Sequence, residues 1–304
     1  MLGYALRRAA TAIPTLFLLV TLAFFLIRLA PGGPFDTERQ LPPAIEANLQ
    51  QRYHLDEPLL QQYGQYLWGI ARGDFGPSFQ YPDLTVTQLI AAGFPVSFTL
   101  GGCAMALALI VGVGFGAIAA INQNGAVDYG VMTVAMLGIS MPSFVLAPLL
   151  ILWLAVYLGW LPAGGLGSWR HFILPAITLA AVQIAYIARL MRGSLIEVLS
   201  APFIRTARAK GLPMRVIFLR HAAPAALAPV VSYLGPATAG IITGSVVIET
   251  IFGIPGLGRH FVNGALNRDY TLVLGVVLFY GLLVIVLNLL VDLLYAWLDP
   301  RVKY

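Results

Sequence analysis

The sequence predicts an all-α membrane protein with six transmembrane helices, and three observations lead to this fold class. Of the 304 residues, 59% are hydrophobic and only 10% are charged, whereas a soluble domain of this size carries about 25% charged residues. The mean hydropathy is +0.83. The apolar residues occur in long runs and do not alternate with polar ones, so we expect helices and not a transmembrane β-barrel.

The first helix is predicted at residues 9–27, close to the roughly 20 apolar residues that cross a bilayer core. Arg7 and Arg8 precede it. A cleaved secretory signal is the alternative. The run is longer than a typical signal core, and Leu29-Ala30-Pro31 lacks the usual small-residue cleavage pattern. We therefore expect residues 1–30 to form an uncleaved first span with a cytoplasmic N-terminus.

Residues 31–95 are polar, and we expect them to form a periplasmic loop or small cap. The region has seven acidic residues against three basic ones, which suits the outer face of the membrane. Residues 42–66 are expected to be helical in part. The stretch Gly73-Asp-Phe-Gly-Pro-Ser78 predicts a turn, because Gly and Pro interrupt regular structure.

Residues 96–304 are expected to form a core of five further helices. The apolar runs place them at residues 96–121, 131–158, 172–191, 225–248 and 271–297. Two pairs of glycines at a spacing of four, Gly112 with Gly116 and Gly240 with Gly244, predict close helix approaches. Pro142, within Ser140-Met-Pro-Ser-Phe144, is expected to break its helix and to contribute to a gate.

The basic residues support a cytoplasmic location for both termini, because basic loops tend to stay in the cytoplasm. Six spans place residues 189–220 and the C-terminal tail on the same side as the N-terminus. That side then holds Arg7, Arg8, Arg189, Arg192, Arg205, Arg208, Lys210, Arg215, Arg220, Arg301 and Lys303. The inner loop at residues 122–130 is the exception, since it has no Lys or Arg.

The stretch 192–224 is the most polar and basic part of the chain. Pro202 near the start and Gly211 just past the end predict a short helix over residues 203–210. Leu212-Pro213 ends this helix, and a second helix can begin at Pro213. We expect a helix, a Gly-Pro corner and another helix between two spans, where a cytosolic partner can push. A simple basic membrane anchor is the alternative.

Several classes of function are disfavoured by what the sequence lacks. The two lysines, Lys210 and Lys303, do not follow glycines, so there is no Walker loop for ATP hydrolysis. The four histidines lie at or beyond the span ends, which disfavours an intramembrane Ser-His hydrolase. Cys103 is the only cysteine, so neither a disulfide nor a cysteine metal cluster can form within the chain. The basic residues follow membrane topology and do not indicate nucleic-acid binding.

A self-powered carrier is also disfavoured, because ionisable residues avoid the middles of the spans. Glu249, Asp292 and Arg189 all lie towards span ends, whereas proton- or ion-coupled carriers place such groups near the bilayer midplane. Energy is therefore expected from a partner protein. An ATPase-independent channel or secondary carrier remains the alternative.

The loop from Phe203 to Ala222 resembles the EAA loop of ABC importer permeases. The family pattern is Glu-Ala-Ala, three residues, Gly, nine residues, Ile, one residue and Leu-Pro. Aligned on Gly211, this chain has Arg205-Thr206-Ala207 at Glu-Ala-Ala, His221 at Ile and Ala223-Pro224 at Leu-Pro. These differences are similar to those of the peptide-importing branch, whose loop reads Arg-Thr-Ala-Arg-Ala-Lys-Gly.

Other stretches resemble the same branch from one end of the chain to the other. They are Leu6-Arg-Arg, Ile13-Pro-Thr, Arg28-Leu-Ala-Pro-Gly, Tyr53-His-Leu-Asp-Glu-Pro, Gly73-Asp-Phe-Gly-Pro-Ser, Glu249-Thr-Ile-Phe-Gly-Ile-Pro-Gly-Leu-Gly, Asn263-Gly-Ala-Leu-Asn-Arg-Asp-Tyr and Asp299-Pro-Arg-Val-Lys-Tyr. The chain looks like the B-type permease subunit of a bacterial oligopeptide importer. Dipeptide, nickel and glutathione importers are its neighbours.

The resemblance implies a type I ABC importer permease fold in the bacterial inner membrane. It implies a related C-type permease, two cytosolic ATPase subunits, a periplasmic peptide-binding protein and an oligopeptide substrate as partners. No cofactor or metal is expected on this chain, and ATP with Mg²⁺ is expected on the ATPases. By the family's arrangement, the residues that couple to an ATPase are Phe203, Arg205, Thr206, Ala207, Arg208, Lys210 and Gly211.

Candidates for the translocation path come from polar residues within the spans and from the predicted helix break. They are Ser140, Met141, Pro142, Gln183, Tyr186, Ser232 and Tyr233. Polar side chains in a path can hold a peptide backbone without sequence preference. Hydrogen bonding between helices is an equal alternative for each of them.

Overall fold

The computed structural model of the protein describes residues 2–29, 56–81 and 83–298. These residues are almost entirely helical, and the one β-contact among them is an isolated bridge between Pro77 and Thr85. Five helices are long and apolar enough to cross a membrane, and a bent helix pair makes a sixth span. The predicted all-α fold with six spans is therefore confirmed. Residues 31–55 of the predicted periplasmic loop and the basic tail lie outside the described residues.

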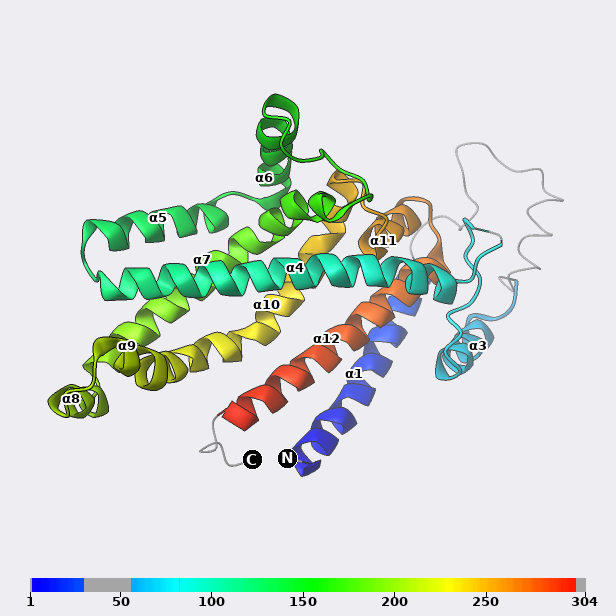
Figure 1. The fold of residues 1–304 in the computed structure, drawn as a ribbon. Coiled ribbons are helices and arrows are strands. Elements are labelled where there is room, and N and C mark those ends of the chain that lie inside the picture. Colours follow the sequence, from blue (N-terminus) through cyan, green and yellow to red (C-terminus); the bar gives the residue numbers. More distant parts are fainter. Residues whose placement is uncertain (1, 30–55, 82, 299–304) are drawn as a thin grey trace. The chain divides into compact units, whose positions relative to one another are not determined.

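Figure 1 shows the described helices. They divide into two compact units. The core unit is Ser97–Ile254 together with both ends of the chain. The cap unit is Ala9–Val96 together with Pro255–Leu283. Three long helices contribute to both units: α1 (Leu2–Leu29), α4 (Val86–Ile121) and α12 (Tyr270–Leu298).

Helix α7 (Ile173–Ser200) is the centre of the core unit. It packs against α5 (Ala126–Ser140) and α10 (Ala223–Ile251). The side chains that face its neighbours are fully buried, among them Ile187, Met191 and Leu195. A short 3₁₀ turn, η2 (Trp169–Phe172), precedes it. Since α7 reaches Ser200, the first part of the predicted loop 192–224 is helix instead.

Glycines let the core helices approach closely, as the two Gly-x-x-x-Gly spacings predicted. A Cβ at Gly116 of α4 would lie 2.5 Å from the backbone oxygen of Ala188, and one at Gly112 would lie 2.8 Å from Ile187. A Cβ at Gly240 of α10 would lie 2.8 Å from the Gln183 amide nitrogen. At Gly116 the near atom is backbone, so a side chain there would push the two helices apart, whereas at Gly240 it is the end of a flexible side chain.

The third span is bent, as the proline in Ser140–Phe144 predicted. Helix α5 ends at Ser140, and α6 (Ser143–Leu150) begins after Met141 and Pro142. The two segments differ in direction by 107°. A π-helical segment, η1 (Ile151–Tyr157), continues from α6. Pro142 removes a backbone donor and disfavours a helical conformation at Met141, which explains the break.

The cap unit packs around the start of α4, α11 (Leu257–Leu266) and the first half of α12. Its buried cluster is Val86, Leu89, Ile90, Leu257, Leu272 and Val276. The unit also holds most of α1 (Leu2–Leu29) and all of α3 (Leu59–Ala71). Helix α4 begins at Val86 and not at residue 96 as predicted. Pro95 therefore lies inside the helix and does not mark its start. Helix α11 was not predicted.

Candidate functional site

The basic stretch forms the predicted short helix, α8 (Pro202–Ala209), at the end of α7 (Figure 1). Pro202 occupies the first turn, where its missing N–H leaves no hydrogen bond unmade. Ile204 and Ala207 are buried. They lie three positions apart and therefore share one face of the helix. Burial of that face fixes which side of α8 remains outward.

The C-terminus of α8 is closed by a Schellman motif. The Leu212 N–H donates to the Ala207 carbonyl at 3.3 Å, and the Gly211 N–H donates to the Arg208 carbonyl at 2.9 Å. Gly211 has φ +73°, a left-handed conformation that glycine adopts without the steric cost of a side chain. The glycine-terminated helix is therefore confirmed, and it ends in a defined conformation.

The outward face of α8 is basic with one large apolar side chain. Phe203 is 48% exposed, and Arg205, Thr206, Arg208 and Lys210 are also exposed. Neither Arg205, Arg208 nor Lys210 forms an ion pair within the part of the chain that the structure describes. Such a surface suits a partner groove that offers acidic groups around an apolar pocket.

The chain after α8 returns directly into a span. Pro213 precedes α9 (Met214–Val216), which continues through a π-helical segment, η3 (Ile217–Ala222), into α10. Ile217 and Ala222 are buried. Helix α8 is thus joined to α7 at one end and to α10 at the other through short connections, so a displacement of α8 acts on both helices.

Gln183, Tyr186 and Tyr233 meet between α7 and α10. The Tyr233 hydroxyl donates to the Gln183 Oε1 atom at 2.9 Å, and the Tyr186 and Tyr233 ring centroids are 5.7 Å apart. Gln183 is 6% exposed and Tyr186 is 39% exposed. The Gln183–Tyr233 contact is an interhelical hydrogen bond, the alternative that the sequence left open.

The two serines among the other path candidates bond to their own helices. The Ser232 hydroxyl donates to the Ala228 carbonyl of its own helix at 3.1 Å, and the Ser140 hydroxyl donates to the Met136 carbonyl at 3.1 Å. Ser140, Met141 and Pro142 form the bend between α5 and α6. Both serine side chains are exposed.

Asp128, which the sequence analysis did not single out, is buried at the start of α5 and binds Arg192 of α7. Two signals pointed to it. It is the only acidic residue in an inner loop without Lys or Arg, and α7 brings basic residues towards the same end of the core. The pairing itself joins positions 64 residues apart, which sequence spacing alone does not reveal.

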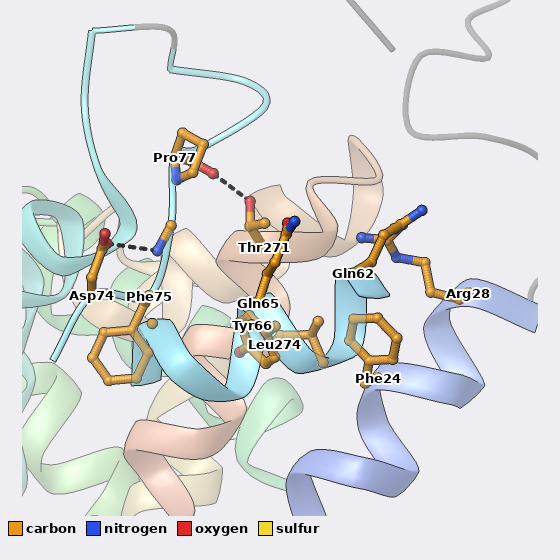
Figure 2. Close-up of a pocket in the computed structure, with 12 residues that line it drawn as sticks. Phe24, Arg28, Gln62, Gln65, Tyr66, Asp74, Phe75, Pro77, Thr271 and Leu274 are labelled. Carbon is orange, nitrogen blue, oxygen red and sulfur yellow. Dashed lines mark hydrogen bonds between the residues drawn. The ribbon is translucent and has the colours of Figure 1, made fainter. Parts of the chain in front are cut away.

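Figure 2 shows a pocket of about 210 Å³ in the cap unit. The Arg28 guanidinium carbon lies 5.2 Å from the Phe24 ring centroid, and Arg28 donates to the Gln62 side-chain oxygen. The Tyr66 hydroxyl is buried without a hydrogen-bond partner among the described residues, and burial raises its pKa. Arg28 and Asp74 are the two charged side chains among the lining residues, and they lie at opposite sides of the view.

A second feature of the cap unit is the buried carboxylate of Asp269, just before α12. Its Oδ2 atom accepts from the Ser78 hydroxyl and from the backbone N–H groups of Phe79 and Gln80. Its Oδ1 atom accepts from the Thr271 hydroxyl at 3.0 Å and from the Leu272 N–H at 3.1 Å. The residue therefore ties the loop at residues 78–80 to the N-terminus of α12.

His260 of α11 packs in the same unit, with its ring 6.4 Å from the Tyr81 ring. Burial, and secondarily the charge of Arg259, lowers the pKa of His260. Its neutral form is therefore favoured in the folded protein. The described residues contain no group of three or more His, Cys, Asp or Glu side chains that could hold a metal ion.

The chain matches known proteins along its whole length. A family model described as "Binding-protein-dependent transport system inner membrane component" matches residues 112–304. Oligopeptide transport system permease proteins OppB from Haemophilus influenzae and Salmonella typhimurium are 56% and 57% identical over 306 residues, with full coverage of both chains. A dipeptide transport system permease protein, DppB, from Bacillus subtilis is 46% identical over all of this chain and 98% of its own.

Solved structures match the fold at low sequence identity. An inward-facing form of the MetNI methionine ABC transporter has a TM-score of 0.60 and 17% identity, over 70% of this chain and 97% of the matched one. A chain of an amino acid ABC transporter crystallised with histidines has a TM-score of 0.51 and 17% identity, over 71% of this chain and 95% of the other.

Proposed function

The chain belongs to the family of binding-protein-dependent transport system inner membrane components, and from this membership we propose that it carries oligopeptides inward as the permease subunit of an ABC importer. The observation that carries the proposal is the full-length identity of 56–57% to the OppB permeases. Identity to the dipeptide permease of Bacillus subtilis is lower, at 46%. Oligopeptides are therefore favoured over dipeptides.

A permease of this kind works with a partner permease, an ATPase and a substrate-binding protein. For this chain we propose a related C-type permease, two cytosolic ATPase subunits and a periplasmic peptide-binding protein. The chain itself is not the ATPase, and ATP with Mg²⁺ is bound and hydrolysed by the partners. The translocation path then runs between the two permeases.

Helix α8 is the proposed contact with one ATPase subunit. Its exposed side chains, Phe203, Arg205, Thr206, Arg208 and Lys210, face the partner groove, while Ala207 packs inward and Gly211 closes the helix. ATP-driven closure of the ATPase subunits displaces α8, and its short connections pass the displacement to α7 and α10 as a rigid-body movement. Hydrolysis returns the permease to the inward-facing state.

In this proposal, α8 and both chain termini lie in the cytoplasm, and the region after the first span lies in the periplasm. The exposed basic residues of α8, α9 and η3 support that orientation, because the positive-inside rule retains basic loops on the cytoplasmic side. Gln183, Tyr186, Ser232 and Tyr233 are proposed to line the path, and the bend at Ser140, Met141 and Pro142 is proposed to act as a gate.

The test is a mild-detergent purification of the tagged chain from its native membrane, followed by an ATPase assay with and without peptide-loaded binding protein. The proposal predicts recovery of a second permease and ATPase subunits, with hydrolysis stimulated by the loaded binding protein. A chain that is recovered alone, without ATPase activity, and that moves peptide across liposomes would instead identify an ATPase-independent carrier.

A further inference from the structure

The ion pair between Asp128 and Arg192 joins helices α5 and α7 of the core unit. The Arg192 Nε atom donates to Oδ1 of Asp128 at 2.7 Å, and its second guanidinium nitrogen donates to Oδ2 at 2.6 Å. Asp128 is 1% exposed, whereas the Arg192 side chain is 29% exposed. This two-bond geometry fixes orientation as well as distance, which a single-point contact from lysine does not.

The turn before α5 holds the carboxylate in place. The Asn124 N–H donates to the Asp128 Oδ2 atom at 2.9 Å. Asn124 itself has φ 62°, a left-handed conformation that asparagine tolerates better than most residues. Asp128 also lies in the first turn of α5, where a negative charge is favoured by the helix dipole. The site is thus built around a charged Asp128.

A third helix, α4, also contacts α7 close to Arg192. Gly116 of α4 approaches α7 so closely that a Cβ would lie 3.0 Å from the Arg192 backbone nitrogen and 2.6 Å from the Met191 Cβ atom. Helices α4 and α5 therefore both contact α7 within one turn of Arg192. Arg192 lies eight positions before the end of α7 at Ser200, and α8 begins two residues later.

The α5–α7 contact continues from the ion pair to the bend of the third span. The two helices run antiparallel, because Asp128 at the start of α5 pairs with Arg192, whereas Gly138 near the end of α5 lies against the backbone of Ala181, eleven residues earlier in α7. Ala135, between these points, is buried. Helix α5 ends two residues after Gly138, where the 107° bend begins. Movement of α7 at the ion pair is thereby imposed on α5 and on its junction with α6.

We propose that Asp128 and Arg192 are positioning residues for energy coupling, which lock α5 to the α8 end of α7 so that displacement of α8 moves the bent span. This inference rests on the proposed function. The pair touches neither the outward face of α8 nor the Gln183–Tyr233 contact, so it acts through the helices it joins. Without the pair, α7 moves with α8 while α5 and the bend follow incompletely.

The test uses the assembled complex, reconstituted in liposomes with peptide-loaded binding protein, and measures peptide taken up per ATP hydrolysed. Asp128→Asn and Arg192→Gln are each expected to lower this ratio about tenfold, within the usual range of coupling between sites. Arg192→Lys is expected to fall between these variants and the wild type, because it keeps the charge and loses the two-bond geometry.

Glu197→Gln is the matched control. Glu197 is an exposed carboxylate of α7, one turn beyond Arg192, and its side chain has no partner among the described residues. The control is expected to keep the wild-type ratio. If Asp128→Asn, Arg192→Gln and Arg192→Lys also keep it in complexes that assemble normally, the inference is overturned. Failure of the proposed function looks different, because the wild-type chain itself then recruits no ATPase or shows no stimulation.

Discussion

Asp128 in the core unit and Asp269 in the cap unit are both buried carboxylates, and they are stabilised by different kinds of hydrogen-bond donor. In the core unit, Asp128 receives a charged partner, Arg192, from another helix. In the cap unit, Asp269 receives hydroxyl and backbone N–H groups from its own surroundings, including Ser78, Phe79 and Leu272. One carboxylate is held by a side chain on a second helix, and the other is held by a loop and a helix N-terminus.

The difference indicates what each unit is built to do. Backbone donors are fixed by the fold, so the Asp269 cluster holds one arrangement for as long as the cap unit is folded. An ion pair between two helices transmits displacement from one helix to the other. We therefore expect changes in the cap unit to affect mainly folding stability, and changes near α8 to affect mainly coupling.

The largest expected effect is from Asp269→Ala in the cap unit. The change leaves several buried donors without an acceptor, and each such group costs about 1–3 kcal/mol, so we expect a loss of about 3 kcal/mol or more in folding stability. Thermal unfolding of the purified chain in detergent measures it. The control is Asp74→Ala, because the exposed Asp74 carboxylate accepts, among the described residues, only from the Gly76 N–H at 2.9 Å. Equal stability of the two variants would contradict the structural role of Asp269.

Next in size is Gly211→Val at the end of α8. A β-branched residue at φ +73° costs about 1–2 kcal/mol, so the Schellman motif is disrupted and peptide uptake is expected to fall about tenfold. Uptake by reconstituted complexes measures the loss. Gly193→Val is the control, because Gly193 lies inside α7 with open space around its Cβ position. Undiminished uptake by Gly211→Val would show that the left-handed corner is not needed.

A smaller effect is expected from Arg208→Glu on the outward face of α8. Arg208 is exposed, so the variant should fold normally and should weaken ATPase docking by charge reversal, by about 1 kcal/mol or somewhat more. The amount of ATPase that co-purifies with the tagged chain measures it, at low and high salt. Arg170→Glu, which changes an exposed arginine of η2, is the control. Equal co-purification of both variants would show that shape and not charge holds the contact.

The smallest expected effect is a pH dependence in the cap unit. Because burial lowers the pKa of His260 below its usual 6.5, the unfolded chain binds a proton at a higher pH than the folded one. Stability is therefore fully present above pH 6.5 and declines as the pH falls below that value. Thermal unfolding between pH 8 and pH 5 measures this slope, and His260→Gln should make it shallower. An unchanged slope in that variant would assign the pH dependence to other groups.

Local sequence signals predicted the features that depend on one or two residues. Gly211 and Pro202 predicted the ends of α8, Pro142 predicted the bend, and the glycine spacings predicted close helix contacts. The start of α4 was placed too late because Pro95 was taken as a boundary. Membrane helices tolerate an internal proline when neighbouring groups satisfy the freed carbonyl.

Features that depend on tertiary packing were not predictable in this way. The contact of Asp128 with Arg192 depends on how α5 lies against α7, and the Asp269 cluster joins segments about 190 residues apart. Helix α11 has polar residues among its apolar ones and is only ten residues long, so it lacks the long apolar run that identified the spans. For α8, the sequence predicted a helix but not that Ile204 and Ala207 would face inward.

The central claim is that α8 seats on an ATPase subunit, and site-specific photocrosslinking tests it most directly. A benzophenone amino acid in place of Phe203, which is 48% exposed, should form an adduct with the ATPase in native membranes. The same amino acid in place of Trp169, which is 72% exposed at the other end of α7, should not. An adduct from position 169 and none from position 203 would contradict the account.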